Sequence, residues 1–133
     1  MEPDALGVEP GAPGVEPGRL VVSFDIDGTM VFGDPPGIIT VAHVLELQQR
    51  GAVVGSASDR TRRDQVGLWE RHGVAVDFVG HKHRLDEVRN RFTATRWIHI
   101  GDTDVDEQYA RVHEFEFHHV DRLPAPGTPG WIW

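Results

Sequence analysis

The stretch LVVSFDIDGT, residues 20–29, decides the fold, because it places a continuous apolar run directly before two aspartates and a glycine. A run of this kind without a polar face is typical of a strand buried on both sides, as in the middle of a parallel sheet. Asp25 and Asp27 mark its carboxyl end. We therefore expect residues 20–26 to form a central strand.

Short apolar runs alternate with helical patterns along the rest of the chain. Further strands are expected at residues 52–58, 76–80, 97–101 and 114–120. The last of these alternates apolar and polar residues, as an edge strand with one exposed face does. Repeated strand–helix units predict an α/β fold, here a Rossmann-like three-layer sandwich with a five-stranded parallel sheet.

Helices are expected between these strands from the helical spacing of apolar side chains. One expected helix spans residues 40–50, and a second begins near Thr61 and ends at Gly73. A third carries Leu85, Val88 and Phe92 on one face, and a fourth carries Val105, Tyr109 and Val112 on one face. In sheets of this class, ligands bind outside the carboxyl ends of the strands, where the strand order reverses. The functional residues are therefore expected directly after each strand.

Composition indicates one soluble globular domain. The 133 residues are 39% hydrophobic and 26% charged, with a net charge of −8, which disfavours a broad nucleic-acid-binding surface. No apolar run approaches the ~18 residues that span a bilayer. The acidic start does not have the pattern of a secretory signal, so we expect a cytoplasmic protein. The absence of cysteine excludes disulfides, thiolate metal sites and cysteine nucleophiles.

The two ends of the chain differ from its middle in composition. Residues 1–18 hold four glycines, four prolines and four acids with no basic residue, and repeat GVEPG twice. Such a segment cannot bury enough apolar surface to fold, so we expect a disordered tail. Residues 19–123 are expected to form the ordered domain, and residues 124–133 a tail with proline and tryptophan.

Carboxylates gather at the predicted carboxyl edge of the sheet. Asp25 and Asp27 follow the first strand, and Asp102 and Asp106 follow the fourth, at a spacing that can share one helix face. Carboxylates so close together repel each other unless a cation or a proton is shared. Hard oxygen donors of this kind suit Mg²⁺. Taken singly, the same residues are also typical of a strand-to-loop turn and of a helix N-terminus.

A hydroxyl and an ammonium group follow the second and third strands. Ser58 can donate to a phosphoryl oxygen or cap a helix, and Ser56, one pleat earlier, is the alternative. Lys82 is the only lysine, beside twelve arginines. A lysine in so arginine-rich a chain favours a position that needs a compact ammonium.

In chain order, FDIDGT at 24–29, the serine that ends GAVVGSAS at 51–58, Lys82 and HIGDTDVD at 99–106 stand at successive strand ends. This set resembles the four motifs of the haloacid dehalogenase-like (HAD) hydrolase superfamily. The resemblance covers roughly residues 19–120 and implies a HAD-like catalytic domain.

The resemblance implies a phosphatase that acts through an aspartyl-phosphate. Asp25 would be the nucleophile, and Asp27 would be the general acid and then the general base. Ser58 would hold the phosphoryl group. Lys82 would neutralise the nucleophile and the phosphate. Asp27 disfavours the dehalogenases of the superfamily, because a halide leaving group needs no proton.

The resemblance also implies a Mg²⁺ ion and a substrate site. Asp25, Asp102 and the backbone carbonyl of Asp27 would bind the metal. Asp106 would support it through water or orient the lysine. The positions expected to contact the substrate are Gly28, Thr29 and Arg60.

The chain has no room for a cap domain of the kind many HAD hydrolases carry. Residues 30–57 hold a short loop, one helix and one strand, and residues 59–81 hold one helix and one strand. Capless members act on large substrates or close the site with a neighbouring subunit. The expected partners are therefore a phosphorylated small molecule, a nucleotide or an oligonucleotide end, and a second copy of the chain.

Other interpretations remain open from the residues alone. A receiver-type phospho-accepting domain has similar groups, although the lysine here precedes the last acidic cluster. A binding scaffold without catalysis is another. The arginines at 60, 62 and 63 can meet a second phosphate or form solvated surface. A zinc site is disfavoured, because it would have to join His81 and His83 to His118 and His119 on a distant edge strand.

Overall fold

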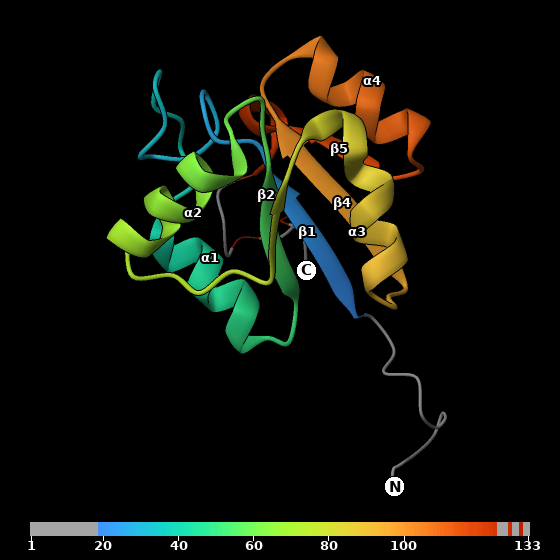
Figure 1. The fold of residues 1–133 in the computed structure, drawn as a ribbon, viewed down its shortest axis with the longest axis horizontal. Helices are drawn as coiled ribbons and strands as arrows, with labels where there is room; N and C mark the ends of the chain where they lie inside the picture. Colours follow the sequence, from blue (N-terminus) through green and yellow to red (C-terminus); the bar gives the residue numbers. More distant parts are fainter. Residues whose placement is uncertain (1–18, 125–127, 129–130, 132–133) are drawn as a thin grey trace, which may run out of the picture.

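The computed structural model describes residues 19–124 together with Thr128 and Trp131. Its five strands pair in parallel in one sheet, in the order β3-β2-β1-β4-β5 (Figure 1). The α/β fold predicted from the sequence is confirmed, while residues 1–18 and most of 124–133 lie outside the described residues. The strands are β1 (Leu20–Phe24), β2 (Val53–Ala57), β3 (Phe78–Gly80), β4 (Arg96–Gly101) and β5 (Glu116–His119).

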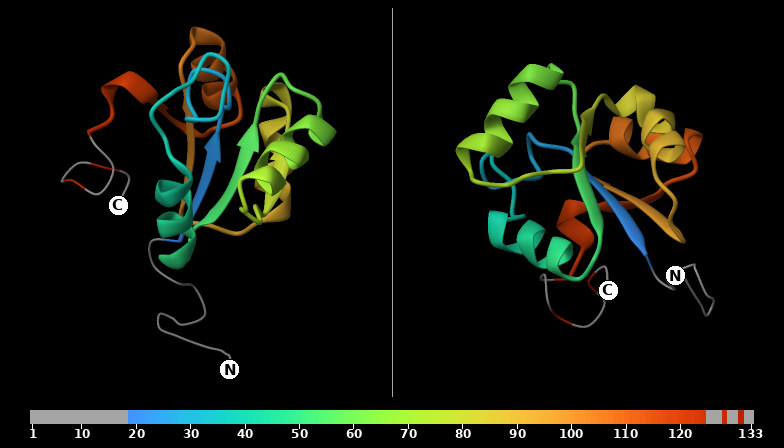
Figure 2. Two further views of the ribbon diagram at one scale, coloured as in Figure 1. Left: turned by 90° about the vertical axis from the view of Figure 1, so that its left-hand side faces the viewer. Right: turned by 60° about the horizontal axis from the view of Figure 1, so that its bottom comes forward.

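Helices α1 and α2 cover one face of the sheet, and α3 and α4 cover the other (Figure 2). The order of connections therefore reverses between β1 and β4. No helix among the described residues is long and apolar enough to cross a bilayer. The helices are α1 (Val41–Gln49), α2 (Arg62–Arg71), α3 (Leu85–Arg91) and α4 (Asp104–Val112), with 3-10 turns η1 (Lys82–Arg84) and η2 (Val120–Arg122).

The central strand β1 is buried along its whole length, as its apolar run predicts. Because successive side chains point to opposite faces, Val22 and Phe24 join the core beneath α1 and α2, and Val21 joins the core beneath α3 and α4. Ser23, which is fully buried, shares the face of Val21. The strand therefore delivers polar groups only to the α3 and α4 side.

Backbone hydrogen bonds continue past the ends of the strands and fix the residues that follow. The Asp25 N–H donates to the Ile100 carbonyl at 2.9 Å, and the Ser58 N–H donates to the Gly80 carbonyl at 3.0 Å. Both residues are thus held at the carboxyl edge of the sheet by the adjacent strands. These hydrogen bonds hold the backbone of two predicted site residues in the same way as the backbone of the strands.

The face of α4 that carries Val105, Tyr109 and Val112 is not the face buried against the sheet. Val105 is 46% exposed and Val112 is 65% exposed, whereas Asp106 and Ala110 are buried. The reason is the capping box at the start of α4, in which the Asp106 carboxylate accepts from the backbone and hydroxyl of Thr103. This start turns the Asp106 side of the helix toward the sheet.

A buried polar network attaches α2 to the sheet. The Ser56 hydroxyl donates to Gln65 Oε1 at 2.7 Å and accepts from Trp69 Nε1 at 2.9 Å. Gln65 Nε2 donates to the carbonyls of Arg60 and Gly80, each at 2.8 Å. Every polar group of the Gln65 side chain is therefore paired in an interior where unpaired groups are costly.

We predict that Gln65→Leu destabilises the fold, because the two carbonyls and the Ser56 hydroxyl each lose a partner. The expected loss in the free energy of unfolding is about 2–4 kcal/mol, measured by urea unfolding. The matched control is Gln48→Leu, since Gln48 makes one exposed hydrogen bond to the Ala75 carbonyl. Equal losses in the two variants would contradict this account of the network.

Candidate functional site

The predicted site residues follow four strands whose carboxyl ends form one edge of the sheet. Asp25 and Asp27 follow β1, Ser58 follows β2, Lys82 opens η1 after β3, and Asp102 follows β4. Because β1 is the central strand and adjoins the reversal of connections, these groups surround the position where ligands of such sheets bind.

Lys82 is a buried ammonium group surrounded by carboxylates. Its Nζ lies 3.3 Å from Asp106 Oδ1, 3.5 Å from Asp25 Oδ2 and 3.7 Å from Asp59 Oδ2. The Lys82 side chain is 5% exposed and that of Asp59 is 85% exposed, so the two buried carboxylates hold the lysine more strongly. Burial lowers the pKa of Lys82, but Asp25 and Asp106 outweigh it, so the pKa is raised and the group is charged.

Asp106 is the fully buried anchor of this cluster. Its Oδ2 accepts from the Thr103 N–H and hydroxyl, at 3.2 Å and 2.7 Å. Its Oδ1 lies 2.8 Å from His99 Nε2. Burial opposes ionisation, yet the contacts with His99, Thr103 and Lys82 hold the pKa of Asp106 well below its ordinary value. Asp106 is therefore ionised.

Asp25 has the opposite preference. Burial and the neighbouring Asp106 charge raise its pKa from 3.8 to about 8, against the opposing effects of Lys82 and the Ile26 N–H. The Ile26 N–H donates to Asp25 Oδ1 at 2.8 Å. Without a bound cation, the two buried carboxyls differ in protonation near neutral pH: Asp106 is ionised and Asp25 is protonated.

Asp25, Asp102 and Asp106 each offer a carboxylate oxygen, and the three oxygens lie within 4.8 Å of one another. Asp102 Oδ1 is buried and has no hydrogen-bond partner among the described residues. Buried polar atoms are normally paired, so an orphaned carboxylate oxygen at this point favours a cation as its partner. This triad can hold a metal ion.

Asp102 and Asp106 come together as expected, but they do not lie on one helix face. The helix α4 begins at Asp104, so Asp102 lies in the loop before the N-cap Thr103. It reaches the triad because Gly28 leaves room for its carboxylate: a Cβ at Gly28 would overlap that carboxylate. Gly28 also has a φ of +77°, which favours glycine.

Asp27 does not join the triad through its carboxylate. Arg60 grips that carboxylate with Nη2 at 2.9 Å from Oδ1 and Nε at 3.1 Å from Oδ2, and the Asp34 N–H donates to Oδ1 at 2.9 Å. Burial would raise the pKa of Asp27, but the hydrogen bonds from Arg60 and Asp34 lower it. Asp27 is therefore ionised and engaged in this arrangement.

Of the two candidate serines, Ser56 is committed to the network beneath α2, whereas Ser58 lies at the sheet edge. The Ser58 Oγ accepts from the Arg60 N–H at 3.1 Å. Thr29 Oγ1 is buried and has no hydrogen-bond partner among the described residues. Among the described residues, the Ser58 hydroxyl has a donor in the Arg60 N–H but no acceptor for its own proton, so of the two serines Ser58 is the one that can donate to a ligand.

The histidines do not assemble a further metal site in the part of the chain that the structure describes. His81 and His83 stack with ring centroids 5.5 Å apart, and His83 is exposed. Among the described residues, the aspartate triad is the one group of three or more such ligands close enough to hold an ion.

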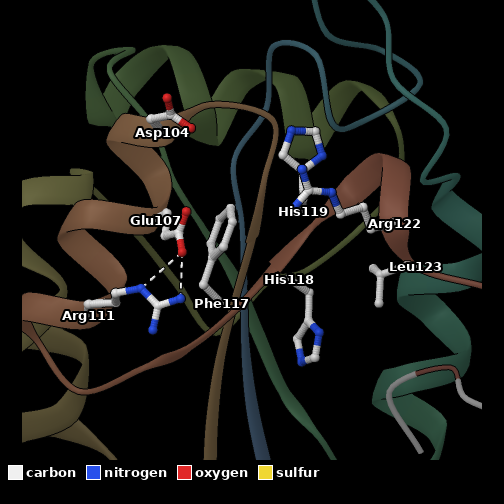
Figure 3. Close-up of a pocket in the computed structure, with 8 residues that line it drawn as sticks. All are labelled: Asp104, Glu107, Arg111, Phe117, His118, His119, Arg122 and Leu123. Atoms are coloured by element: carbon white, nitrogen blue, oxygen red, sulfur yellow. Dashed lines mark hydrogen bonds and ion pairs between the residues drawn. The ribbon is translucent and has the colours of Figure 1, made fainter.

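A hollow of about 420 Å³ lies between α4, β5 and the residues that follow β5 (Figure 3). Figure 3 shows Phe117 between Glu107 and His119, with Glu107 paired to Arg111. Neither the triad nor Lys82 lines this hollow, so it is separate from the buried charge cluster. Its walls are formed by Asp104, Glu107, Arg111, Phe117, His118, His119, Arg122 and Leu123.

Two contacts that hold the site together are not predicted from the sequence, those of Arg60 with Asp27 and of His99 with Asp106. Arg60 is predicted to contact the substrate, whereas its hydrogen-bonded ion pair with Asp27 is not predicted. His99 was not singled out, although in WIHIG at 97–101 it is the one polar side chain in an apolar run, and it is buried. Strand alternation places His99 on the α4 face, and this was the available signal.

No family model, curated protein sequence or solved structure matches this chain.

We predict that, in the presence of a chelator, stability falls between about pH 4 and pH 8 through Asp25. The folded state keeps a proton on Asp25 up to a pKa of about 8, while the unfolded chain releases it near 3.8, so rising pH favours unfolding. Asp25→Asn removes the titrating carboxyl and with it this dependence of stability on pH. Urea unfolding of wild type and Asp25→Asn at several pH values should show curves that diverge as pH rises, by a few kcal/mol at most.

Asp104→Asn is the matched control, since Asp104 is exposed and outside the triad. It should keep the pH dependence of the wild type. Parallel curves for wild type and Asp25→Asn would show that Asp25 is ionised in the metal-free fold.

We also predict that Gly28→Ala abolishes cation binding at the triad, because its methyl group displaces the Asp102 carboxylate. Gly73→Ala is the control: Gly73 has a φ of +73° but no atom within 4 Å of an added Cβ. Both variants should lose about 1 kcal/mol of stability from the positive φ. Calorimetric titration with Mg²⁺ should show binding in Gly73→Ala and none in Gly28→Ala; equal affinities would refute the steric argument.

Proposed function

We propose that this chain is a Mg²⁺-dependent phosphomonoester hydrolase that acts through an aspartyl-phosphate on Asp25. The observation that carries the proposal is a buried charge cluster at the ligand-binding edge of the sheet. In it, Lys82 contacts Asp25, and two further carboxylates lie close to the same aspartate. The HAD-like order of the motifs in the sequence supports the same assignment.

The residues present fit a magnesium ion. The donors are hard carboxylate oxygens, and one of them, Asp102 Oδ1, is buried without a hydrogen-bond partner among the described residues. We assign the metal to Asp25, Asp102 and Asp106, together with the backbone carbonyl of Asp27. When bound, the ion supplies positive charge that favours ionised Asp25 and offsets the charge on the phosphoryl oxygens.

In the first step, an oxygen of ionised Asp25 attacks phosphorus, and the bond from phosphorus to the leaving oxygen breaks. Protonated Asp27 gives its proton to that leaving oxygen. In the second step, Asp27 takes a proton from water as the water attacks phosphorus, and the bond to Asp25 breaks. Lys82 and the Ser58 hydroxyl hold the phosphoryl oxygens throughout.

The same mechanism requires Asp27 to separate from Arg60. A guanidinium group binds phosphate in the same forked geometry as it binds a carboxylate, so an arriving phosphate monoester competes for Arg60. We therefore assign Arg60 to substrate binding, with Gly28 and Thr29 at the adjacent turn. Release from Arg60 removes an interaction that lowers the pKa of Asp27, which favours its protonation.

A specific observation favours a second candidate, a phospho-accepting domain with slow turnover. Ionised Asp27 has no proton to give to a leaving oxygen, and Arg60 and the Asp34 N–H occupy the carboxylate that would take a proton from water. Phosphorylation by a reactive donor such as acetyl phosphate would then still proceed, because that leaving group needs no proton. The resulting aspartyl-phosphate would persist.

We propose a phosphorylated small molecule, or the end of a nucleotide or oligonucleotide, as substrate. The segments 30–40 and 58–61, which border the edge of the sheet, hold no helix or strand that could form a lid. Such an open site admits a large leaving group or is completed by a second copy of the chain. Arg62 is already paired with Glu87 at 2.8 Å, and Arg60 is paired with Asp27 and Asp64, so we assign a second phosphate to Arg63.

The test is phosphate release from a panel of sugar phosphates, nucleotides, a 3′-phosphorylated oligonucleotide and an aryl phosphate. We predict release with Mg²⁺ and none with chelator. Asp25→Asn should lower the rate at least about a hundredfold, because the nucleophile is lost. Asp104→Asn, the same change in the exposed neighbour of the triad, should keep the rate.

Intact-mass measurement after acetyl phosphate treatment separates the two candidates. A phosphoryl group that stays on wild type and is absent from Asp25→Asn would favour the phospho-accepting domain. Rapid loss with phosphate release would favour the hydrolase. Undiminished release by Asp25→Asn would rule out the aspartyl-phosphate mechanism for this chain.

A further inference from the structure

His99 occupies an unusual place for an imidazole. It lies in the middle of β4, is fully buried, and faces the α4 side of the sheet. The ring packs 6.5 Å from that of Phe117 on the neighbouring strand β5. A polar ring in such an interior destabilises the fold unless its nitrogens are hydrogen-bonded.

Both ring nitrogens of His99 are paired. Nδ1 lies 3.0 Å from the Ser23 hydroxyl, and Nε2 lies 2.8 Å from Asp106 Oδ1. An ionised carboxylate only accepts hydrogen bonds, so Nε2 carries the proton and donates it to Asp106. Ser23 fixes the plane of the ring from the opposite side.

His99 contacts the buried charge cluster through one oxygen atom, Asp106 Oδ1. Asp106 Oδ2 is taken by Thr103, so Oδ1 alone is shared between His99 Nε2 and Lys82 Nζ, at 2.8 Å and 3.3 Å. The same Nζ lies 3.5 Å from Asp25 Oδ2. A continuous line of buried contacts therefore runs from Ser23 to Asp25, and its members are Ser23, His99, Asp106, Lys82 and Asp25.

Without the His99 hydrogen bond, Asp106 Oδ1 would keep only Lys82 as a partner. The carboxylate would then turn about its Thr103 contacts, and Lys82 would shift between Asp106 and Asp25. Partners of this kind, one contact removed from the reacting groups, are known to orient the groups that do the chemistry.

We propose that His99 is a positioning residue that holds Asp106 Oδ1 in place, so that Lys82 Nζ stays between Asp106 and Asp25. The inference of an effect on turnover rests on the proposed function, whereas the position of Lys82 does not. The two parts are therefore tested by separate measurements.

Two substitutions at the same position separate hydrogen bonding from bulk. In His99→Gln, the amide nitrogen takes the place of Nε2 and can still donate to Asp106. In His99→Asn, the shorter amide takes the place of Nδ1, keeps the Ser23 contact and loses the one to Asp106. With Mg²⁺ and the best substrate of the panel, kcat should fall at least about tenfold in His99→Asn with little change in KM, and within about threefold in His99→Gln.

The position of Lys82 has a direct readout, because it is the only lysine in the chain. Lysine-specific ¹⁵N labelling gives a single side-chain ammonium signal. Measured without Mg²⁺ or substrate, this signal should be sharp and protected from exchange in wild type and His99→Gln. It should broaden or vanish in His99→Asn. His72→Asn, the same change in an exposed histidine at the end of α2, should leave it unchanged.

The possible outcomes are distinct. A folded His99→Asn with normal kcat and a sharp lysine signal would overturn the proposal and make His99 a packing residue. The expected lysine signals with no phosphate release from wild type would contradict the proposed function and support the positioning role. If His99→Asn does not fold, imidazole ¹⁵N spectra of wild type decide, since a proton on Nδ1 of the buried ring instead of Nε2 would overturn the proposal.

Discussion

The arrangement of charge around Lys82 is the constraint on which the site depends. One buried ammonium contacts two buried carboxylates within 3.5 Å, and a carboxylate oxygen of Asp102 lies within 4.8 Å of one oxygen of each of them. Negative charge in a low-dielectric interior is tolerated only if it is paired, protonated or bound to a cation. The protein uses the first two: Asp106 is paired with Lys82 and His99, and Asp25 holds a proton. A metal ion would supply the third.

The geometry of the parallel sheet creates this cluster. Side chains alternate between faces, so Ser23 and His99 face the α4 side, where Asp106 meets them. Gly28 and Gly101 leave the space that the carboxylates of Asp102 and Asp106 fill. Fold and site are therefore determined by the same residues, and a change that repacks the carboxyl edge also changes the chemistry available there.

The sequence was sufficient to predict the sheet and the strand ends, because long apolar runs followed by acids leave few alternatives. It was not sufficient for the orientation of α4, since the capping interaction between Thr103 and Asp106 turns Asp106 toward the sheet and leaves Val105 and Val112 exposed. The grip of Arg60 on Asp27 joins residues 33 positions apart and depends on how α2 meets the sheet. Such contacts need tertiary geometry, whereas the order of motifs is visible in one dimension.

The central strand β1 pairs with both β2 and β4 and leads directly into Asp25. A local fluctuation that separates β1 from its neighbours must therefore break the pairing in the middle of the sheet, where opening amounts to unfolding the whole domain. Amide hydrogens of β1 should exchange with solvent only through global unfolding. A ligand bound at this edge would then slow exchange across the entire sheet, and its affinity could be obtained from amides far from the point of contact.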